Sequence, residues 1–146
     1  MDLRDSAAIH IRDCRQSEHA DILAVFNSAR ACAGCFGANL TTADEFAALI
    51  NGEELFVAEH AGAIAGFVAV WAPENFIHHL YVLPAAQGRG VGSSLLQFCE
   101  ARYGRTLSLK CSLVNVRALQ FYQRKGWVAK GAGIGDDGPW DHLFLE

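Results

Sequence analysis

One segment constrains the fold most, because it joins a strand-like run, a glycine-rich turn and a helix-like run. Residues 76–83 are apolar and aromatic, and Pro84 follows them. The turn Gln87–Gly92 contains three glycines, and an amphipathic pattern over 90–103 predicts a helix that Gly104 ends. Glycine lets a ligand approach the backbone, and N–H groups at a helix start attract anions. The segment therefore predicts a site for a phosphate-bearing ligand.

The remaining sequence predicts an ordered series of strands and helices. Strands are predicted over 9–12, 55–59, 63–71, 106–112, 127–130 and 142–145, and helices over 17–30, 42–50 and 115–125. Ser17 and Thr42 are the candidate N-caps of the first two helices, and a loop over 131–141 joins the last two strands. The order β-α-α-β-β-β-α-β-α-β-β predicts an α/β sandwich around a mixed sheet, with residues 1–146 as one domain.

Length and composition narrow the class of protein. The chain has 146 residues, 51% of them hydrophobic, which suits one buried core. The longest apolar run, 63–72, is about half the roughly twenty residues that a membrane-spanning helix needs. The first residues also lack the apolar region of a signal peptide. We therefore expect a cytoplasmic protein.

Cysteine and charge patterns carry weaker signals. Five cysteines, an odd number, predict free thiols, and the pair Cys32 and Cys35 is more simply two small buried residues than a metal or redox site. We expect no metal. Residues 81–130 carry a net charge of +7 and the remainder −11, so one segment suits polyanions and the other cations, unless both are solvated surface.

Two common phosphate motifs do not match the glycine-rich turn. No Gly-Lys-Ser/Thr follows it, which excludes the Walker type. The dinucleotide fingerprint requires glycine where Ser93 stands, and Lys110 occupies the position expected for a ribose-binding acid. The turn therefore matches neither of these motifs, and its phosphate-bearing ligand must belong to another class.

The turn instead resembles the Gln/Arg-x-x-Gly-x-Gly/Ala pattern of the GNAT superfamily of N-acetyltransferases. The preceding residues 80–84 and the later segment 115–127 are also similar to cofactor-binding segments of that family. The resemblance implies a mixed, mostly antiparallel sheet of about six or seven strands, flanked by four helices, whose central strands splay apart. It also implies acetyl-coenzyme A as co-substrate and transfer of the acetyl group to a primary amine.

The resemblance further implies which residues hold the cofactor. They are Leu80, Tyr81, Val82, Gln87, Gly88, Arg89, Gly90, Val91, Gly92, Ser93 and Asn115. A main-chain N–H near Leu80 would bind the thioester oxygen, which becomes an oxyanion during attack. Packing in the core would explain Leu80 and Val82 equally well, and an N-cap role would explain Asn115.

Tyr122 is the candidate acid. It lies seven residues after Asn115, the family spacing, which places both on one side of a predicted helix. Its phenol would donate a proton to the sulfur of coenzyme A. The alternative is a half-buried aromatic whose hydroxyl reaches solvent.

His78 is the candidate base, with a water chain as the alternative. Strict alternation along the strand would place Phe76, His78 and Leu80 on one face and Ile77, His79 and Tyr81 on the other. A histidine stands at the matching position in GNAT members that acetylate arylalkylamines. Histidine exchanges protons near neutral pH, although one hydrogen-bonded within the sheet would look the same.

The resemblance places the acceptor in a groove formed by the first two helices, their loop and the last strands. Those segments contain Phe36, Asp44, Glu45, Asp136, Asp137, Trp140 and Asp141, which would suit a cationic amine. We expect a small-molecule acceptor, but a polyamine, amino acid, aminoglycoside, arylalkylamine or protein amine remains open. The oligomeric state is open as well, a homodimer included.

Two other functions are compatible with parts of the sequence. A non-catalytic acyl-coenzyme A sensor or partner module would need the phosphate loop but no proton donor at the thiol, so Tyr122 argues against it. A nucleic-acid binder would use the basic segment. That segment shows no recognition motif, so we expect no nucleic-acid partner.

Overall fold

The computed structural model describes residues 8–34, 36 and 39–145, which form one seven-stranded sheet with helices on both faces. The elements follow the predicted order: β1 (Ile9–Asp13), α1 (His19–Ala33), α2 (Ala43–Leu49), β2 (Glu54–His60), β3 (Ala63–Trp71), β4 (Phe76–Val82), α3 (Val91–Tyr103), β5 (Ser108–Ser112), α4 (Val116–Arg124), β6 (Trp127–Gly135) and β7 (Gly138–Leu145). This confirms the mixed α/β fold. No helix among the described residues is long and apolar enough to cross a membrane.

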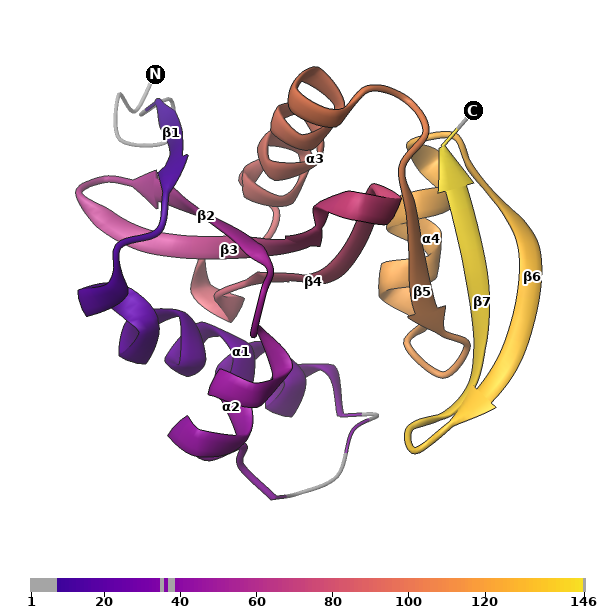
Figure 1. Cartoon of the computed structure of the whole chain (residues 1–146), viewed down its shortest axis with the longest axis horizontal. Coiled ribbons are helices and arrows are strands. Elements are labelled where there is room, and N and C mark those ends of the chain that lie inside the picture. Colours follow the sequence, from indigo (N-terminus) through magenta and orange to yellow (C-terminus); the bar gives the residue numbers. More distant parts are fainter. Residues whose placement is uncertain (1–7, 35, 37–38, 146) are drawn as a thin grey trace.

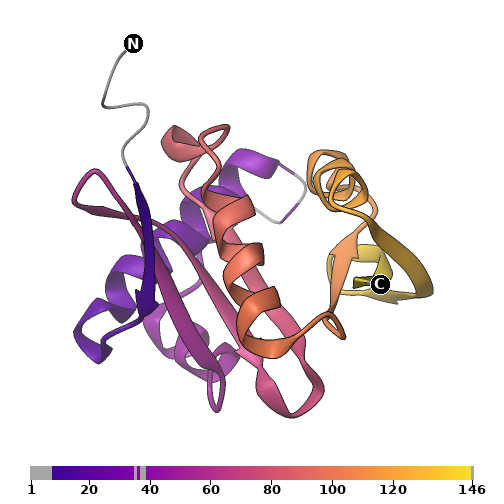
Figure 2. The ribbon, with the colours of Figure 1, turned by 90° about the horizontal axis from the view of Figure 1, so that it is seen from above.

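The sheet has the strand order β1-β2-β3-β4-β5-β7-β6. Its neighbouring strands run antiparallel except β4 and β5, which are parallel. β4 and β5 pair only at Phe76 with Ser108 and at Ile77 with Leu109, and then diverge. Figure 2 shows the result from above, with β5, β6, β7 and α4 set apart from the earlier strands. The predicted splaying of the central strands is confirmed.

Two apolar clusters hold the helices on the sheet. One lies between the sheet and the helices α3 and α4, and includes Leu95 and Tyr122. The other lies on the opposite face, where Phe26 of α1 and Phe46 of α2 pack against Phe67 of β3. Both faces of the central strands are therefore buried, which fixes the position of β4 between α1 and α3 (Figure 1).

The helix α2 has the predicted start, whereas α1 does not. Thr42 accepts a hydrogen bond from the N–H of Glu45, whose carboxylate accepts one from the N–H of Thr42. Ser17, the predicted cap of the first helix, instead lies in the short 3-10 turn Gln16–Glu18, and α1 begins at His19. Glu18 is the N-cap residue of α1 but its side chain makes no capping hydrogen bond, because its carboxylate accepts the N–H of Arg15 within the preceding turn.

The loop predicted over 131–141 is wrong, because β6 and β7 extend through it as a hairpin. The strands reach Gly135 and resume at Gly138, leaving a two-residue turn of Asp136 and Asp137. A side chain at Gly133 would place its Cβ 2.2 Å from the ring of Trp140. The glycines therefore make room for the tryptophan across the strand pair instead of marking a loop.

An irregularity in β4 changes which side chains share a face. Ala69 of β3 pairs with His79 and Val70 pairs with Ile77, so His78 is the extra residue of a β-bulge. Strict alternation is therefore wrong here. Ile77 packs in the same cluster as Leu80, and the rings of His78 and His79 stack 4.0 Å apart.

Candidate active site

The loop between β4 and α3 owes its shape to two glycines. Gly88 and Gly90 have φ angles of +79° and +86°, in the left-handed region that other residues rarely adopt. Gly92 has a different role: it lies in the first turn of α3, where an added Cβ would lie 3.3 Å from the ring of Phe121. The expectation that all three simply leave room for a phosphate is thus refined. Two form the turn and one lets α4 approach α3.

The N-terminus of α3 is free to bind an anion. Gly90 is its N-cap, and no side chain of the described residues caps it. The first N–H bonded to the N-cap carbonyl is that of Ser94, at 3.0 Å, so the preceding N–H groups point out of the helix end. The side-chain amide of Gln87 donates to the carbonyl of Val82 at 3.2 Å and ties the loop to β4. Such an end binds phosphate oxygens.

A pocket of about 660 Å³ extends from this helix end along the last residues of β4 to the start of α4. Of the predicted cofactor residues, it is lined by Leu80, Tyr81, Val82, Gln87, Gly88, Gly90, Val91, Gly92, Ser93 and Asn115. Arg89 is exposed and is not among the lining residues. The side chain of Asn115 accepts the N–H of Ala118 at 3.4 Å, so it also caps α4. We call this cavity the first pocket.

Tyr122 lies where the first pocket meets a smaller one. Its side chain is buried between Phe121 and Trp127, with 7% of the residue exposed, and it lines both cavities. Burial, reinforced by Cys111, raises the pKa of Tyr122 above its ordinary value. The phenol therefore keeps its proton at neutral pH and can donate it to a group bound in either pocket. The alternative of a half-buried phenol turned to solvent does not fit this burial.

The smaller cavity, the second pocket, has a volume of about 340 Å³ and aromatic walls. Phe36, Phe76, His78, Tyr81, Tyr122 and Trp140 line it, together with the charged Arg30, Lys110 and Asp137. It contains Phe36, Asp137 and Trp140 from the predicted acceptor groove. Asp44, Glu45, Asp136 and Asp141 are not among its lining residues.

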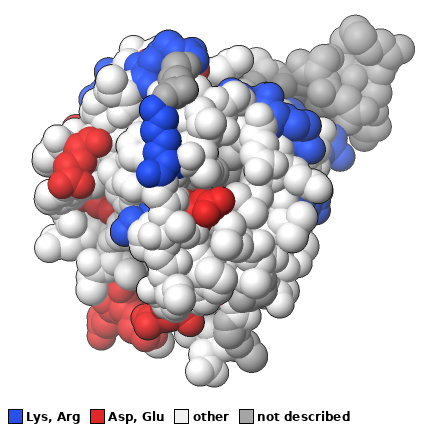
Figure 3. Space-filling model, turned by 90° about the vertical axis from the view of Figure 1, so that its right-hand side faces the viewer, with Lys and Arg blue, Asp and Glu red and all other residues white. Residues whose placement is uncertain are grey.

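The charge of the second pocket also differs from the predicted acidic groove. Arg30 lies 3.8 Å from the ring centroid of Phe36, donates to the hydroxyl of Tyr81 at 3.1 Å and pairs with Asp137 at 3.4 Å. Lys110 lies 4.4 Å from the ring centroid of Trp140. On the face shown in Figure 3, basic side chains gather mainly in the upper half and acidic ones towards the left and below. The site is therefore mixed in charge, with flat apolar walls.

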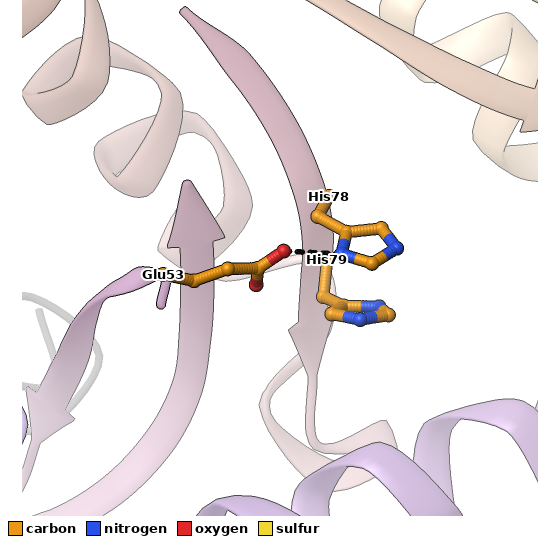
Figure 4. Close-up of side chains that lie close together, drawn as sticks. All are labelled: Glu53, His78 and His79. Carbon is orange, nitrogen blue, oxygen red and sulfur yellow. Dashed lines mark hydrogen bonds and ion pairs between the residues drawn. The ribbon is translucent and has the colours of Figure 1, made fainter. Parts of the chain in front are cut away.

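His78 forms an ion pair that the sequence gave no reason to expect. Its Nδ1 contacts a carboxylate oxygen of Glu53, which lies 25 positions earlier, immediately before β2 (Figure 4). The side chain of Glu53 is 4% exposed, whereas that of His78 is 40% exposed and lines the second pocket. No spacing rule connects the two residues, because the antiparallel pairing of β2, β3 and β4 brings them together.

His79 lies beside this pair but points into the core. Its ring contacts Phe26 edge-on at 5.5 Å, and 9% of the residue is exposed. Burial, followed by the nearby His78 and Arg30, lowers the pKa of His79 to about 3, so its imidazole is neutral at pH 7.

The cysteine expectations are met in part. Cys14, Cys32, Cys99 and Cys111 are free thiols. Cys32 is exposed and lines the first pocket, so the expectation that it is buried is wrong. Cys35, its proposed neighbour in a C-x-x-C pair, lies outside the described residues.

Comparison with known proteins gives a consistent result. Residues 51–129 match the family described as "Acetyltransferase (GNAT) domain". A 5-NmdU N-acetyltransferase of Pseudomonas phage PaMx11 is 31% identical over 135 residues, which is 89% of this chain and 94% of that protein. The peptidyl-lysine N-acetyltransferase YiaC of Escherichia coli is 33% identical over 72 residues, about half of each chain (49% and 48%).

Solved structures share the fold over nearly the whole chain. A GCN5-related N-acetyltransferase from Rhodopseudomonas palustris superimposes with a TM-score of 0.78 at 22% identity, covering 96% of each chain. The putative acetyltransferase yncA of Salmonella typhimurium, solved with its cofactor acetyl-CoA, gives 0.69 at 19% identity and covers 95% of this chain and 94% of its own. At these identities the likeness concerns the fold.

Replacing Gly90 should weaken binding of coenzyme A at the helix end. We expect Gly90→Val to raise the dissociation constant about 10-fold or more, because the side chain disfavours the left-handed φ that shapes the loop. Isothermal titration calorimetry measures this. Gly104→Val is the matched control, since Gly104 has a φ of +85° at the other end of α3. Equal affinity in the two variants would contradict the role of the loop.

Proposed function

The chain belongs to the GNAT family of acetyltransferases and uses acetyl-coenzyme A as its co-substrate, and we propose that it acetylates the primary amine of a small molecule by direct attack. The observation that carries this proposal is the meeting of the two pockets at Tyr122. The first pocket suits the coenzyme, and the second can hold the amine beside the thioester.

The dimensions of the second pocket support a small acceptor. A volume of about 340 Å³ lies within the range of cavities that enclose small molecules. Its walls include Phe76 and Trp140, which suit a flat or apolar body more than an extended chain. The relative matched over most of its length is named for action on 5-NmdU, whereas the peptidyl-lysine enzyme is matched over about half of its length. The more extensive match therefore supports a small acceptor over a lysine side chain, without identifying it.

The proposed reaction needs one proton acceptor and one proton donor. The neutral amine nitrogen forms a bond to the thioester carbon, and the carbon–sulfur bond then breaks. The nitrogen loses a proton to His78, directly or through water, and the leaving thiolate takes one from Tyr122. A main-chain N–H near Leu80, in the part of β4 that β5 leaves unpaired, would stabilise the oxyanion.

We also propose a single catalytic domain in the cytoplasm. One sheet and its helices carry both pockets, which supports one domain over residues 1–146. Free thiols at the described cysteines favour a reducing compartment. A homodimer stays a prediction, and light scattering coupled to size-exclusion chromatography tests it.

A panel of amines tests the proposed function. Acetyl-coenzyme A and the protein are mixed with arylalkylamines, aminoglycosides, polyamines, amino acids and lysine peptides, and release of the free thiol is followed. We expect turnover with a small amine and little with lysine peptides. Preference for the peptides would contradict the acceptor class, and tight cofactor binding without any turnover would favour a sensor.

Tyr122→Phe should separate proton donation from cofactor binding. The ring and its packing against Trp127 are retained, so we expect the dissociation constant of coenzyme A to change less than about twofold. Loss of the hydroxyl should lower kcat by about 10- to 100-fold. Steady-state kinetics and calorimetry give the two values. A wild-type kcat would remove Tyr122 as the acid.

His78→Gln should change how the rate depends on pH. A histidine base must be neutral to accept the proton of the amine, so a rate that depends on one falls in acid. Glutamine cannot take up that proton, and we expect a lower and flatter profile of kcat/KM. If the profile of the variant matches that of the wild type, water and not His78 removes the proton.

A further inference from the structure

We propose that Glu53 is a positioning residue, which holds His78 in the tautomer whose Nε2 accepts the proton of the attacking amine. This inference rests on the proposed role of His78 as base. It goes further by assigning a role to a buried carboxylate outside the sequence motifs, and it predicts which nitrogen of His78 carries hydrogen.

The burial of Glu53 needs an explanation. Its side chain is 4% exposed, and taking a carboxylate out of water is unfavourable unless it is paired. Among the described residues, the ion-pair and hydrogen-bond partner of this carboxylate is His78, with no lysine or arginine in contact. The second oxygen, Oε2, is buried without a hydrogen-bond partner. The contact with His78 is therefore the interaction that compensates for burying the carboxylate of Glu53.

The main chain fixes the carboxylate in place. The N–H of Glu53 donates to the carbonyl of Ile50 at 3.1 Å, which closes the turn after α2. Gly52 within that turn has a φ of +79°, and an added Cβ would lie 3.2 Å from the ring of Trp71. Since β2 then begins at Glu54, the side chain of Glu53 projects from a rigid turn towards β4 (Figure 4).

The bulge in β4 brings the imidazole of His78 to this carboxylate. As the extra residue of the bulge, His78 leaves the strict alternation of the strand and stacks on His79 at 4.0 Å with an angle of 24° between the rings. His79 is itself packed against Phe26. The ring of His78 is therefore limited on one side by a buried aromatic stack and bound at one nitrogen by Glu53.

The chemistry of the contact sets the tautomer. An ionised carboxylate only accepts hydrogen bonds, so the Nδ1 of neutral His78 must carry hydrogen. Its Nε2 then has a free lone pair and lies on the side of the ring away from Glu53 (Figure 4). When Nε2 takes a proton from the amine, the positive imidazolium remains next to the carboxylate. The same logic makes a carboxylate the orienting partner of a histidine base in hydrolases.

Kinetics of a double-mutant cycle test the dependence of Glu53 on His78. We expect Glu53→Gln to lower kcat about 10- to 100-fold, with KM for acetyl-coenzyme A unchanged within about twofold. In the His78→Gln background, the same change should lower kcat less than about twofold, because Glu53 acts only through His78. An equal loss in both backgrounds would show a structural role and overturn the proposal.

The matched control is Glu54→Gln at the next position. Glu54 is exposed and accepts a hydrogen bond from the hydroxyl of Tyr103, away from both pockets. Its kinetics should equal those of the wild type. All assays contain EDTA, because ligand atoms of Glu53, His78 and His79 lie within 4.8 Å of one another and are close enough to bind a cation. Activity that EDTA abolishes and zinc restores would assign the carboxylate to a metal and also overturn the proposal.

Long-range ¹H–¹⁵N NMR of the histidine rings gives a measurement that needs no substrate. At a pH where His78 is neutral, we expect hydrogen on Nδ1 in the wild type and a mixture of tautomers in Glu53→Gln, because an amide both donates and accepts. Hydrogen on Nε2 in the wild type would overturn the proposal. If the hydrogen is on Nδ1 but His78→Gln has wild-type kinetics, Glu53 sets the tautomer of His78. His78 is then not the base.

Discussion

The separation of β4 from β5 is the constraint on which the whole site depends. Parallel neighbours normally satisfy each other's backbone groups along their length, but here pairing stops after Phe76 and Ile77. β5 therefore offers no backbone partner to β4 beyond Ile77. Leu80 and Tyr81 of β4 and Tyr122 of α4 line both pockets, and residues of β5 line only the second. A fully paired sheet would have no place for an extended cofactor arm.

A glycine-rich turn follows β4, a bulge lies near its beginning, and the proposed site uses both. After Val82 the chain turns through Gly88 and Gly90 and presents the start of α3 to an anion. Near its beginning, the bulge at His78 turns two imidazoles to the same region. Because the strand between them is packed on both faces, the distance between the two ends is set by a rigid element. The phosphates and the reacting amine can therefore be held in a fixed relation.

The sequence predicted the order of elements well because hydrophobic runs and caps are local signals. The box at Thr42 and the cap at Asn115 are confirmed, as are the strand–loop–helix segment and the splayed strands that the family resemblance implied. Predictions from local signals were wrong where contacts with residues distant in the sequence determine the structure. Glycines that accommodate Trp140 looked like a loop, and the cap predicted at Ser17 is absent because Ser17 lies in a 3-10 turn before α1.

The residues of the first pocket were predicted from the sequence better than those of the second. The cofactor residues form nearly continuous segments, and all but Arg89 line the first pocket. The alternation expected along β4 fails at His78, because a bulge depends on how the neighbouring strand pairs. Glu53 was missed altogether, since nothing in its own surroundings in the sequence marks it. The second pocket differs from the predicted acidic groove because Arg30 and Lys110 line it beside Asp137.

The hairpin of β6 and β7 has a consequence for how this fold can diversify. Trp140 supplies a wall of the second pocket but is not among the residues that line the first. The space for its ring is made by Gly133 on the adjacent strand, near the edge of the sheet. Substitutions in this hairpin can therefore reshape the second pocket without changing any residue that lines the first. Under the proposed roles of the two pockets, the choice of acceptor can evolve while cofactor binding is conserved.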